Sequence, residues 1–113
     1  MELEEFRSRL LNERQSLIAL SDGARESRSP VTLDQASVGR LSRMDAIQVQ
    51  AMAMEAERRR QTQIKRIDAA IKRIDEGEFG YCVGCGEAIS EKRLGADPTT
   101  PFCTPCMAGR SDR

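Results

Sequence analysis

Two short stretches decide the fold: CVGC at residues 82–85 and CTPC at residues 103–106. Two C-x-x-C pairs separated by 17 residues are typical of a tetrahedral Cys₄ zinc site. The pairs contain all the cysteines of the 113-residue chain, which has no histidine to serve as a nitrogen ligand. The predicted metal ligands are therefore Cys82, Cys85, Cys103 and Cys106. Because four thiolates leave no open coordination position, we expect one Zn²⁺ ion with a structural role.

Other uses of the cysteines fit the sequence less well. Disulfides need an oxidising compartment, and a redox-active C-x-x-C normally occurs singly beside a β-α-β pattern, which is not visible here. Iron in the same four-sulfur cage stays open, because ligand geometry alone does not separate it from zinc. We expect Phe79, Tyr81 and Phe102 to form a small apolar shell around the metal, and residues 86–102 to form a short helix or hairpin.

Upstream of the finger, two segments have the apolar periodicity of amphipathic helices. The first covers residues 2–20, with Gly23 as a helix stop, and the second runs from Met44 to Glu76, with Gly77 as its stop. Their apolar stripes consist of Leu3, Phe6, Leu10, Leu17 and Leu20 in the first segment, and Ile64, Ile67, Ile71 and Ile74 in the second. The predicted fold is mainly α: an antiparallel helical hairpin (coiled coil) in residues 1–77, followed by a small C-terminal Cys₄ zinc finger and a short tail in residues 78–113.

The connection between the two helices is expected within about residues 21–42. The stretch 21–32 has the composition of a linker, and Ser29 precedes Pro30, which disfavours helical geometry. Asp34 is a candidate N-cap for a helix that opens at Gln35, although the helix start could be as late as Ser42.

Charge and hydropathy exclude several classes of protein. Eighteen Lys and Arg balance eighteen Asp and Glu, and the longest strictly apolar run, residues 51–54, is far too short to span a bilayer. The acidic start at residues 2–5 is unlike an export signal, so we expect a cytoplasmic protein without membrane contact. No enzyme is expected, since the sequence has no histidine, no nucleophile–base pair and no open metal site.

The finger resembles a known family along four stretches: GYCVGCGEAI at 80–89, KRL at 92–94, DPT at 97–99 and FCTPC at 102–106. They closely resemble the DksA/TraR C4-type zinc-finger proteins. The resemblance implies a bacterial transcription regulator that does not recognise a DNA sequence. Such proteins bind RNA polymerase, insert the helical hairpin into its secondary channel, and use acidic residues at the hairpin tip to alter initiation. Several respond to the alarmone ppGpp.

At the tip, this chain departs from the family motif D-x-x-D-x-A. The nearest acidic candidates are Asp45 and Asp34, and either could instead cap a helix or pair with Arg40 or Arg43. The family's anion-binding positions on the second helix are filled by Arg59 and Arg66, but two positions in the finger hold Asp97 and Met107. Because a carboxylate weakens an anion site, we expect weak or absent ppGpp binding.

Basic residues recur along the second helix, at 58–60, 65–66 and 72–73. Clustered cations suit phosphate contacts, so a zinc ribbon that binds nucleic acid directly stays an alternative, although a solvated face with intrahelical ion pairs is favoured. Lys92 and Arg93 of the finger could contact polymerase or water. A third possibility is a helical adaptor that self-associates through its isoleucines, but a monomer is expected.

Overall fold

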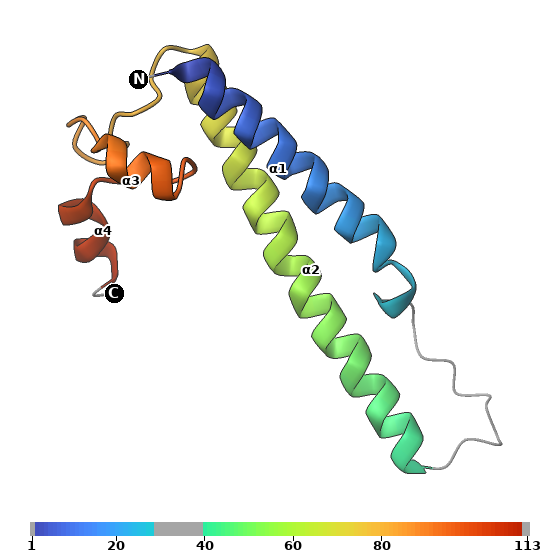
Figure 1. Cartoon of the computed structure of the whole chain (residues 1–113). Helices are drawn as coiled ribbons and strands as arrows, with labels where there is room; N and C mark the ends of the chain where they lie inside the picture. The colour runs from blue at the N-terminus through green and yellow to red at the C-terminus, as the bar shows by residue number, and fades with distance from the viewer. Residues whose placement is uncertain (1, 29–39, 112–113) are drawn as a thin grey trace. The chain divides into compact units, whose positions relative to one another are not determined.

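The computed structural model describes residues 2–28 and 40–111, and this part of the chain is helical apart from the finger loops (Figure 1). Its elements are α1 (Leu3–Gly23), the 3₁₀ helix η1 (Glu26–Arg28), α2 (Arg40–Asp75), α3 (Glu91–Ala96) and α4 (Thr104–Ser111). The only β pairing among the described residues is an isolated antiparallel bridge between Tyr81 and Ala88. The predicted fold class, a mainly α protein with a helical hairpin and a C-terminal finger, is confirmed.

The ends of the long helices differ in detail from those predicted. α1 continues to Gly23, so the expectation that a linker begins at Ser21 is wrong for these three residues. The described part of α2 begins at Arg40, whereas the candidate cap Asp34 and the start at Gln35 lie outside the described residues. The predicted stop is present: Gly77 has a φ of 75°, which a glycine adopts without steric cost.

The chain divides into two compact units, and each contains parts of both long helices. The finger unit comprises Met1–Arg14 and Ile64–Arg113, and the middle unit comprises Gln15–Gln63. No helix within the described residues is long and apolar enough to cross a membrane.

In the finger unit, α1 and α2 are antiparallel and enclose an apolar core. Arg7 pairs with Asp75, and Arg14 Nε lies 2.7 Å from Asp68 Oδ1. The later residue of α1 thus contacts the earlier residue of α2, as in an antiparallel pair. The core side chains with at most 8% exposure are Leu10, Ile64, Ile67, Ala70, Phe79, Cys82, Ile89 and Leu94. Ile71 and Ile74 are half-buried, so the predicted isoleucine stripe does face the core.

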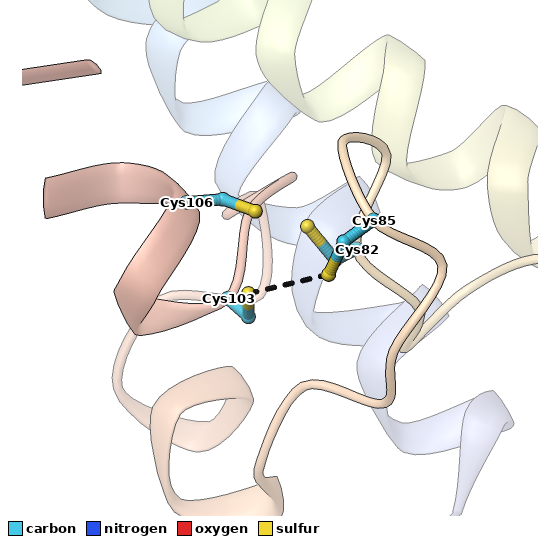
Figure 2. Close-up of side chains that lie close together, drawn as sticks. All are labelled: Cys82, Cys85, Cys103 and Cys106. Atoms are coloured by element: carbon cyan, nitrogen blue, oxygen red, sulfur yellow. Dashed lines mark hydrogen bonds between the residues drawn. The ribbon is translucent and has the colours of Figure 1, made fainter. Parts of the chain in front are cut away.

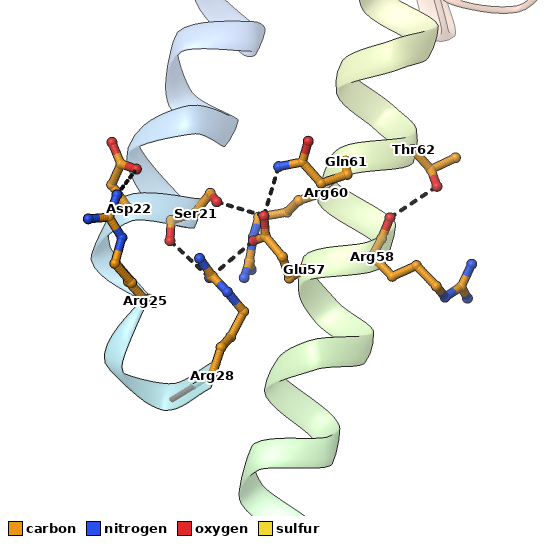
Figure 3. A network of polar contacts seen from close by, with 9 residues as sticks. All are labelled: Ser21, Asp22, Arg25, Arg28, Glu57, Arg58, Arg60, Gln61 and Thr62. Atoms are coloured by element: carbon orange, nitrogen blue, oxygen red, sulfur yellow. Dashed lines mark hydrogen bonds and ion pairs between the residues drawn. The ribbon is translucent and has the colours of Figure 1, made fainter. Parts of the chain in front are cut away.

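The middle unit is joined by polar contacts more than by apolar ones. Ser21 Oγ donates to Glu57 Oε2 at 2.7 Å (Figure 3). Gln50 Nε2 donates to the carbonyl of Arg28 at 3.4 Å, so the order of contacts along the two segments is again antiparallel. Leu20, predicted on the inward stripe, is 59% exposed. Leu3, in the finger unit, is also exposed, so the inward stripe of α1 is shorter than its periodicity predicts.

Candidate metal centre

Four cysteine sulfurs, contributed by two separate turns, converge on one point of the finger (Figure 2). All four lie within 4.8 Å of one another, and the sulfurs of Cys85 and Cys103 are 3.6 Å apart. Zinc–sulfur bonds of about 2.3 Å in tetrahedral geometry require sulfurs separated by about 3.8 Å. The cluster therefore has the size of a tetrahedral four-sulfur cage.

The first turn is a small hairpin that aims two sulfurs the same way. Cys82 N–H donates to the carbonyl of Glu87 at 2.8 Å, Gly86 N–H donates to the carbonyl of Cys82 at 2.9 Å, and Gly84 N–H donates to Cys82 Sγ at 3.3 Å. Gly86 has a φ of 78°, as the tight turn requires, because a side chain is strained in that conformation. This N–H to sulfur bond stabilises a thiolate at Cys82.

The second turn places the other two sulfurs at the start of α4. Cys103 lies just before the helix and Cys106 lies in its first turn, with Met107 N–H donating to the carbonyl of Cys103 at 2.9 Å. Val83 N–H donates to the carbonyl of Pro101 at 2.8 Å and so ties the first turn to the second. The residues between the pairs include the predicted short helix, α3.

The thiols differ in acidity before any cation is considered. Backbone N–H groups, that of Cys103 first and then those of Cys85 and Gly84, lower the pKa of Cys82 to about 6. Hydrogen bonding to the neighbouring thiols, Cys103 first, raises the pKa of Cys106 to about 12. Four thiolates this close repel one another, and a bound divalent cation removes that repulsion. The donor set, its spacing and the closed geometry therefore fit one structural zinc ion.

The aromatic residues near the cysteines have different environments, so the predicted apolar shell is incomplete. Phe102 is half-buried and its ring lies beside Gly84, where the Cβ of a larger residue would be 3.6 Å from Cδ1 of Phe102. Phe79 is buried but packs on Phe6 of α1, with ring centroids 5.3 Å apart, and Tyr81 is 55% exposed. Phe79 therefore joins the finger to α1 rather than shielding the sulfurs.

Arg93, predicted as a polymerase or anion contact, forms hydrogen bonds within the finger. It lies on α3, where Ser90 Oγ accepts the Arg93 N–H at 3.2 Å and caps the helix. Its Nε donates to the carbonyl of Phe102 at 3.2 Å, and its terminal nitrogens lie 3.5 Å from the hydroxyls of Thr100 and Thr104. Its guanidinium therefore holds α3 to the turn that carries the second cysteine pair.

Arg66 and Asp97, both singled out in the sequence, form an ion pair between α2 and the finger. Arg66 donates to Asp97 Oδ2 at 3.1 Å, while Asp97 Oδ1 accepts the N–H and hydroxyl of Thr99. Burial alone would raise the pKa of Asp97, but the bonds from Thr99 and the charge of Arg66 hold it below its ordinary value. Arg66 therefore already has an acidic partner within the chain.

The remaining candidates lie in the middle unit or outside the described residues. Asp45 is exposed on the first turns of α2, and Asp34 lies outside the described part. Arg59 is 75% exposed and lies 3.6 Å from Glu55 Oε1.

Sequence reasoning missed the contacts that fasten the finger to the helices. Arg9 of α1 donates to the carbonyl of Gly95 at 2.7 Å, and Arg73 of α2 lies 3.5 Å from the carbonyl of Thr99. The bond from Thr99 N–H to the Asp97 side chain could have been predicted from the sequence. An Asp side chain commonly accepts the N–H of the second residue after it, as in the stretch Asp97-Pro98-Thr99. The contact of Arg9 could not have been predicted, because its partner is a backbone carbonyl far away in the sequence.

Comparison with known proteins supports the same interpretation of the finger. The family model described as "Prokaryotic dksA/traR C4-type zinc finger" matches residues 77–111. The RNA polymerase-binding transcription factor DksA of Haemophilus influenzae is 46% identical over 43 residues, which are 38% of this chain and 30% of that protein. The protein of the same name from Escherichia coli K12 is 42% identical over 43 residues, again 38% of this chain and 28% of the relative. The match thus spans less than a third of these curated relatives.

Two solved structures extend the likeness beyond the finger. Transcription factor DksA2 from Pseudomonas aeruginosa is similar with a TM-score of 0.77 at 24% identity, over 98% of this chain and 84% of that one, which is a likeness of fold. The DnaK suppressor protein from Agrobacterium tumefaciens C58 is 30% identical with a TM-score of 0.58, over 96% of this chain and 94% of that one. Together with the Cys₄ finger, this places the chain in the DksA/TraR family of C4-type zinc-finger proteins.

Proposed function

We propose that this protein is a zinc-containing bacterial transcription regulator that binds RNA polymerase in the cytoplasm. Its helical hairpin enters the secondary channel and modulates initiation, and the finger docks at the rim. Cys82, Cys85, Cys103 and Cys106 ligate the zinc ion, whose role is to fold the finger. The protein recognises no DNA sequence and carries no catalytic step.

One observation carries the proposal: a Cys₄ finger packs in one unit with the ends of an antiparallel helix pair. Phe6 of α1 contacts Phe79, and Arg66 of α2 pairs with Asp97, so the finger is fastened to both helices. The names of the curated relatives support polymerase as the partner. The direct test is retention of core RNA polymerase by the immobilised zinc-loaded protein, and absence of retention would contradict the proposal.

Asp45 and Asp34 are the proposed acidic residues of the tip. Asp45 is exposed, as a residue that meets polymerase must be. The test is transcription in vitro with Asp45→Asn and Asp34→Asn, which remove a charge but keep the side chain's size. We expect one variant to bind polymerase and lose its effect on initiation. Wild-type activity of both would contradict the acidic-tip mechanism.

We also propose that ppGpp does not control this protein. The Arg66 guanidinium is paired with Asp97 at 3.1 Å. The Asp97 carboxylate would repel an incoming phosphate group, which could bind Arg66 only by displacing it. Equilibrium dialysis should detect no ppGpp binding at micromolar concentrations, and Asp97→Asn should improve affinity by releasing Arg66. Micromolar binding by the wild type would contradict this statement.

A ribbon that binds nucleic acid directly is less well supported. The arginines of the 58–60 run have acidic neighbours on α2: Arg58 and Arg59 pair with Glu55, and Arg60 with Glu57. These pairs lower the local field that a phosphate backbone would meet. We expect no duplex-DNA binding by fluorescence anisotropy near 0.15 M salt, and steeply salt-dependent binding would favour the ribbon instead.

A further inference from the structure

One side of α2 in the middle unit carries a row of side chains of which all but the half-buried Ala56 are exposed. The row, here called the outer face, recurs at steps of four and three and consists of Asp45, Val49, Met52, Ala56 and Arg59. Val49 is 59% exposed and Met52 is 74% exposed, although both are large apolar side chains. Residues at these steps lie on one helix face, so the row is continuous. Exposed apolar side chains grouped in this way mark an interaction surface.

The charges of the outer face are arranged symmetrically about its centre. Asp45 lies seven residues before Met52 and Arg59 lies seven residues after it, which is about 10 Å in each direction at 1.5 Å per residue. An antiparallel copy of the same helix, related by a two-fold axis through Met52, would thus set Asp45 opposite the partner's Arg59. A two-fold interface requires a self-complementary surface of this kind.

Both charged ends of the face are available for an outside partner. Among the residues whose side chains are described, which exclude 40–42, none forms an ion pair with the Asp45 carboxylate. Arg59 lies 3.6 Å from Glu55, but Glu55 is already bound by Arg58 at 2.6 Å, so Arg59 adds a second, longer contact to a satisfied carboxylate. Such exposed pairs contribute little and are readily exchanged.

A shallow groove of about 400 Å³ lies beside Met52 and is lined by Ala51, Met52, Glu55, Ala56 and Arg59. Ala51 and Ala56 have small side chains, which let a second helix approach closely. A methionine side chain is unbranched and adapts to irregular apolar surfaces. The groove can therefore receive the partner's Met52, while its own Met52 enters the equivalent groove of the partner.

We propose that a second copy of this chain packs antiparallel on the outer face, with Met52 at the two-fold axis and two Asp45–Arg59 ion pairs between the copies. This replaces the monomer expected from the sequence. The sequence also suggested self-association through the isoleucines of the second helix, but Ile64 and Ile67 are buried within one chain and cannot contact a second copy. Contact over a few helical turns is smaller than a standard stable interface, so the dimer is weak and concentration-dependent.

Self-association would also regulate polymerase binding, and this consequence rests on the proposed function. Asp45 is a candidate tip residue, and in the dimer its carboxylate is paired and covered by the second chain. Polymerase would then capture only the dissociated chain. The dimer itself is measured without polymerase, so failure of the dimer and failure of polymerase binding are separate results.

The test is sedimentation equilibrium of the full zinc-loaded chain over a dilution series. Met52→Glu sets two carboxylates against each other at the axis and should weaken association at least roughly tenfold. Asp45→Lys and Arg59→Glu should each do the same, because each sets like charges opposite one another. The double variant Asp45→Lys/Arg59→Glu restores opposite charges and should recover association.

Met54→Glu is the matched control, because Met54 is also exposed on α2 but lies about 200° around the helix from Met52. It should associate as the wild type does, and circular dichroism should show unchanged helicity in every variant. Recovery in the double variant is a result that a merely misfolded single variant would not give. A wild type that stays monomeric at every concentration, or equal weakening by Met54→Glu, would overturn the proposal.

Discussion

Glu57 is a half-buried carboxylate on which groups from both long helices converge (Figure 3). Its oxygens accept from Ser21 and Gln61 at 2.7 Å, from Arg60 at 2.9 Å and from Arg28 at 3.2 Å. These hydrogen bonds, the one from Ser21 first, lower the pKa of Glu57 from its ordinary 4.5 to about 2. The ionised carboxylate therefore stabilises the middle unit.

Replacing Glu57 with Gln should lower the melting temperature at neutral pH and flatten its dependence on pH. A depressed pKa contributes stability that is present above the unfolded value near 4.5 and is lost as pH falls towards 2. The measurement is thermal unfolding by circular dichroism from pH 7 to pH 2. Glu78→Gln is the control, because Glu78 is exposed in the loop after α2, away from a helix N-terminus, and it should behave as the wild type. Parallel pH curves for Glu57→Gln and wild type would contradict the role given to Glu57.

Single residues also show where prediction from sequence stops. The cysteine cluster was predictable, because C-x-x-C is a local turn and its two copies have a recognised separation. The pairing of Glu57 with Ser21 and Arg28 was not, since it depends on how α1 and α2 are aligned, and the sequence leaves that alignment open. The tip assignment to Asp45 or Asp34 stays a prediction.

The two long helices follow from their periodicity, although their burial is uneven. Leu10 of α1 and Ile67 of α2 are completely buried, whereas Leu20 is 59% exposed despite lying on the same predicted stripe as Leu10. Periodicity identifies the face of a helix, but exposure depends on what lies opposite. Opposite the end of α1, the polar network of Glu57 takes the place of an apolar core.

Leu10→Ala should reduce the free energy of unfolding by about 2–4 kcal/mol, because it removes a fully buried side chain and leaves a cavity. Urea unfolding of the zinc-loaded protein, followed by circular dichroism, measures this difference. Ile18→Ala, at a position on α1 that is 37% exposed, should cost about 1 kcal/mol or less. Equal effects of the two substitutions would show that Leu10 does not lie in a packed core.

For the protein as a whole, the zinc site should decide whether the finger folds, and the long helices should depend on it less. α3 and α4 contain 6 and 8 residues, against 21 and 36 in α1 and α2. A segment this small has too little apolar core to fold alone, and metal binding supplies the missing free energy. The assignment of residues 78–113 as a separate domain stays a prediction.

Cys82→Ser should abolish zinc binding, unfold the finger and leave most of the helical signal, with a loss of about a fifth at most. Metal content by mass spectrometry and helicity by circular dichroism check the two parts. Val83→Ser is the control, because Val83 lies inside the same C-x-x-C turn with 63% exposure and offers no sulfur. One equivalent of zinc in Cys82→Ser, or cooperative melting of a metal-free finger, would contradict the prediction.

The two units draw on different stretches of the chain, and these stretches leave the ribosome at different times. The middle unit uses only the contiguous residues 15–63, so its helices can pair as soon as that stretch has emerged. Residues 1–14 must wait for partners in residues 64–113. At roughly 5–20 residues per second, translation takes several seconds to supply them. During that interval Leu10, which is completely buried in the folded chain, lacks the partners that cover it.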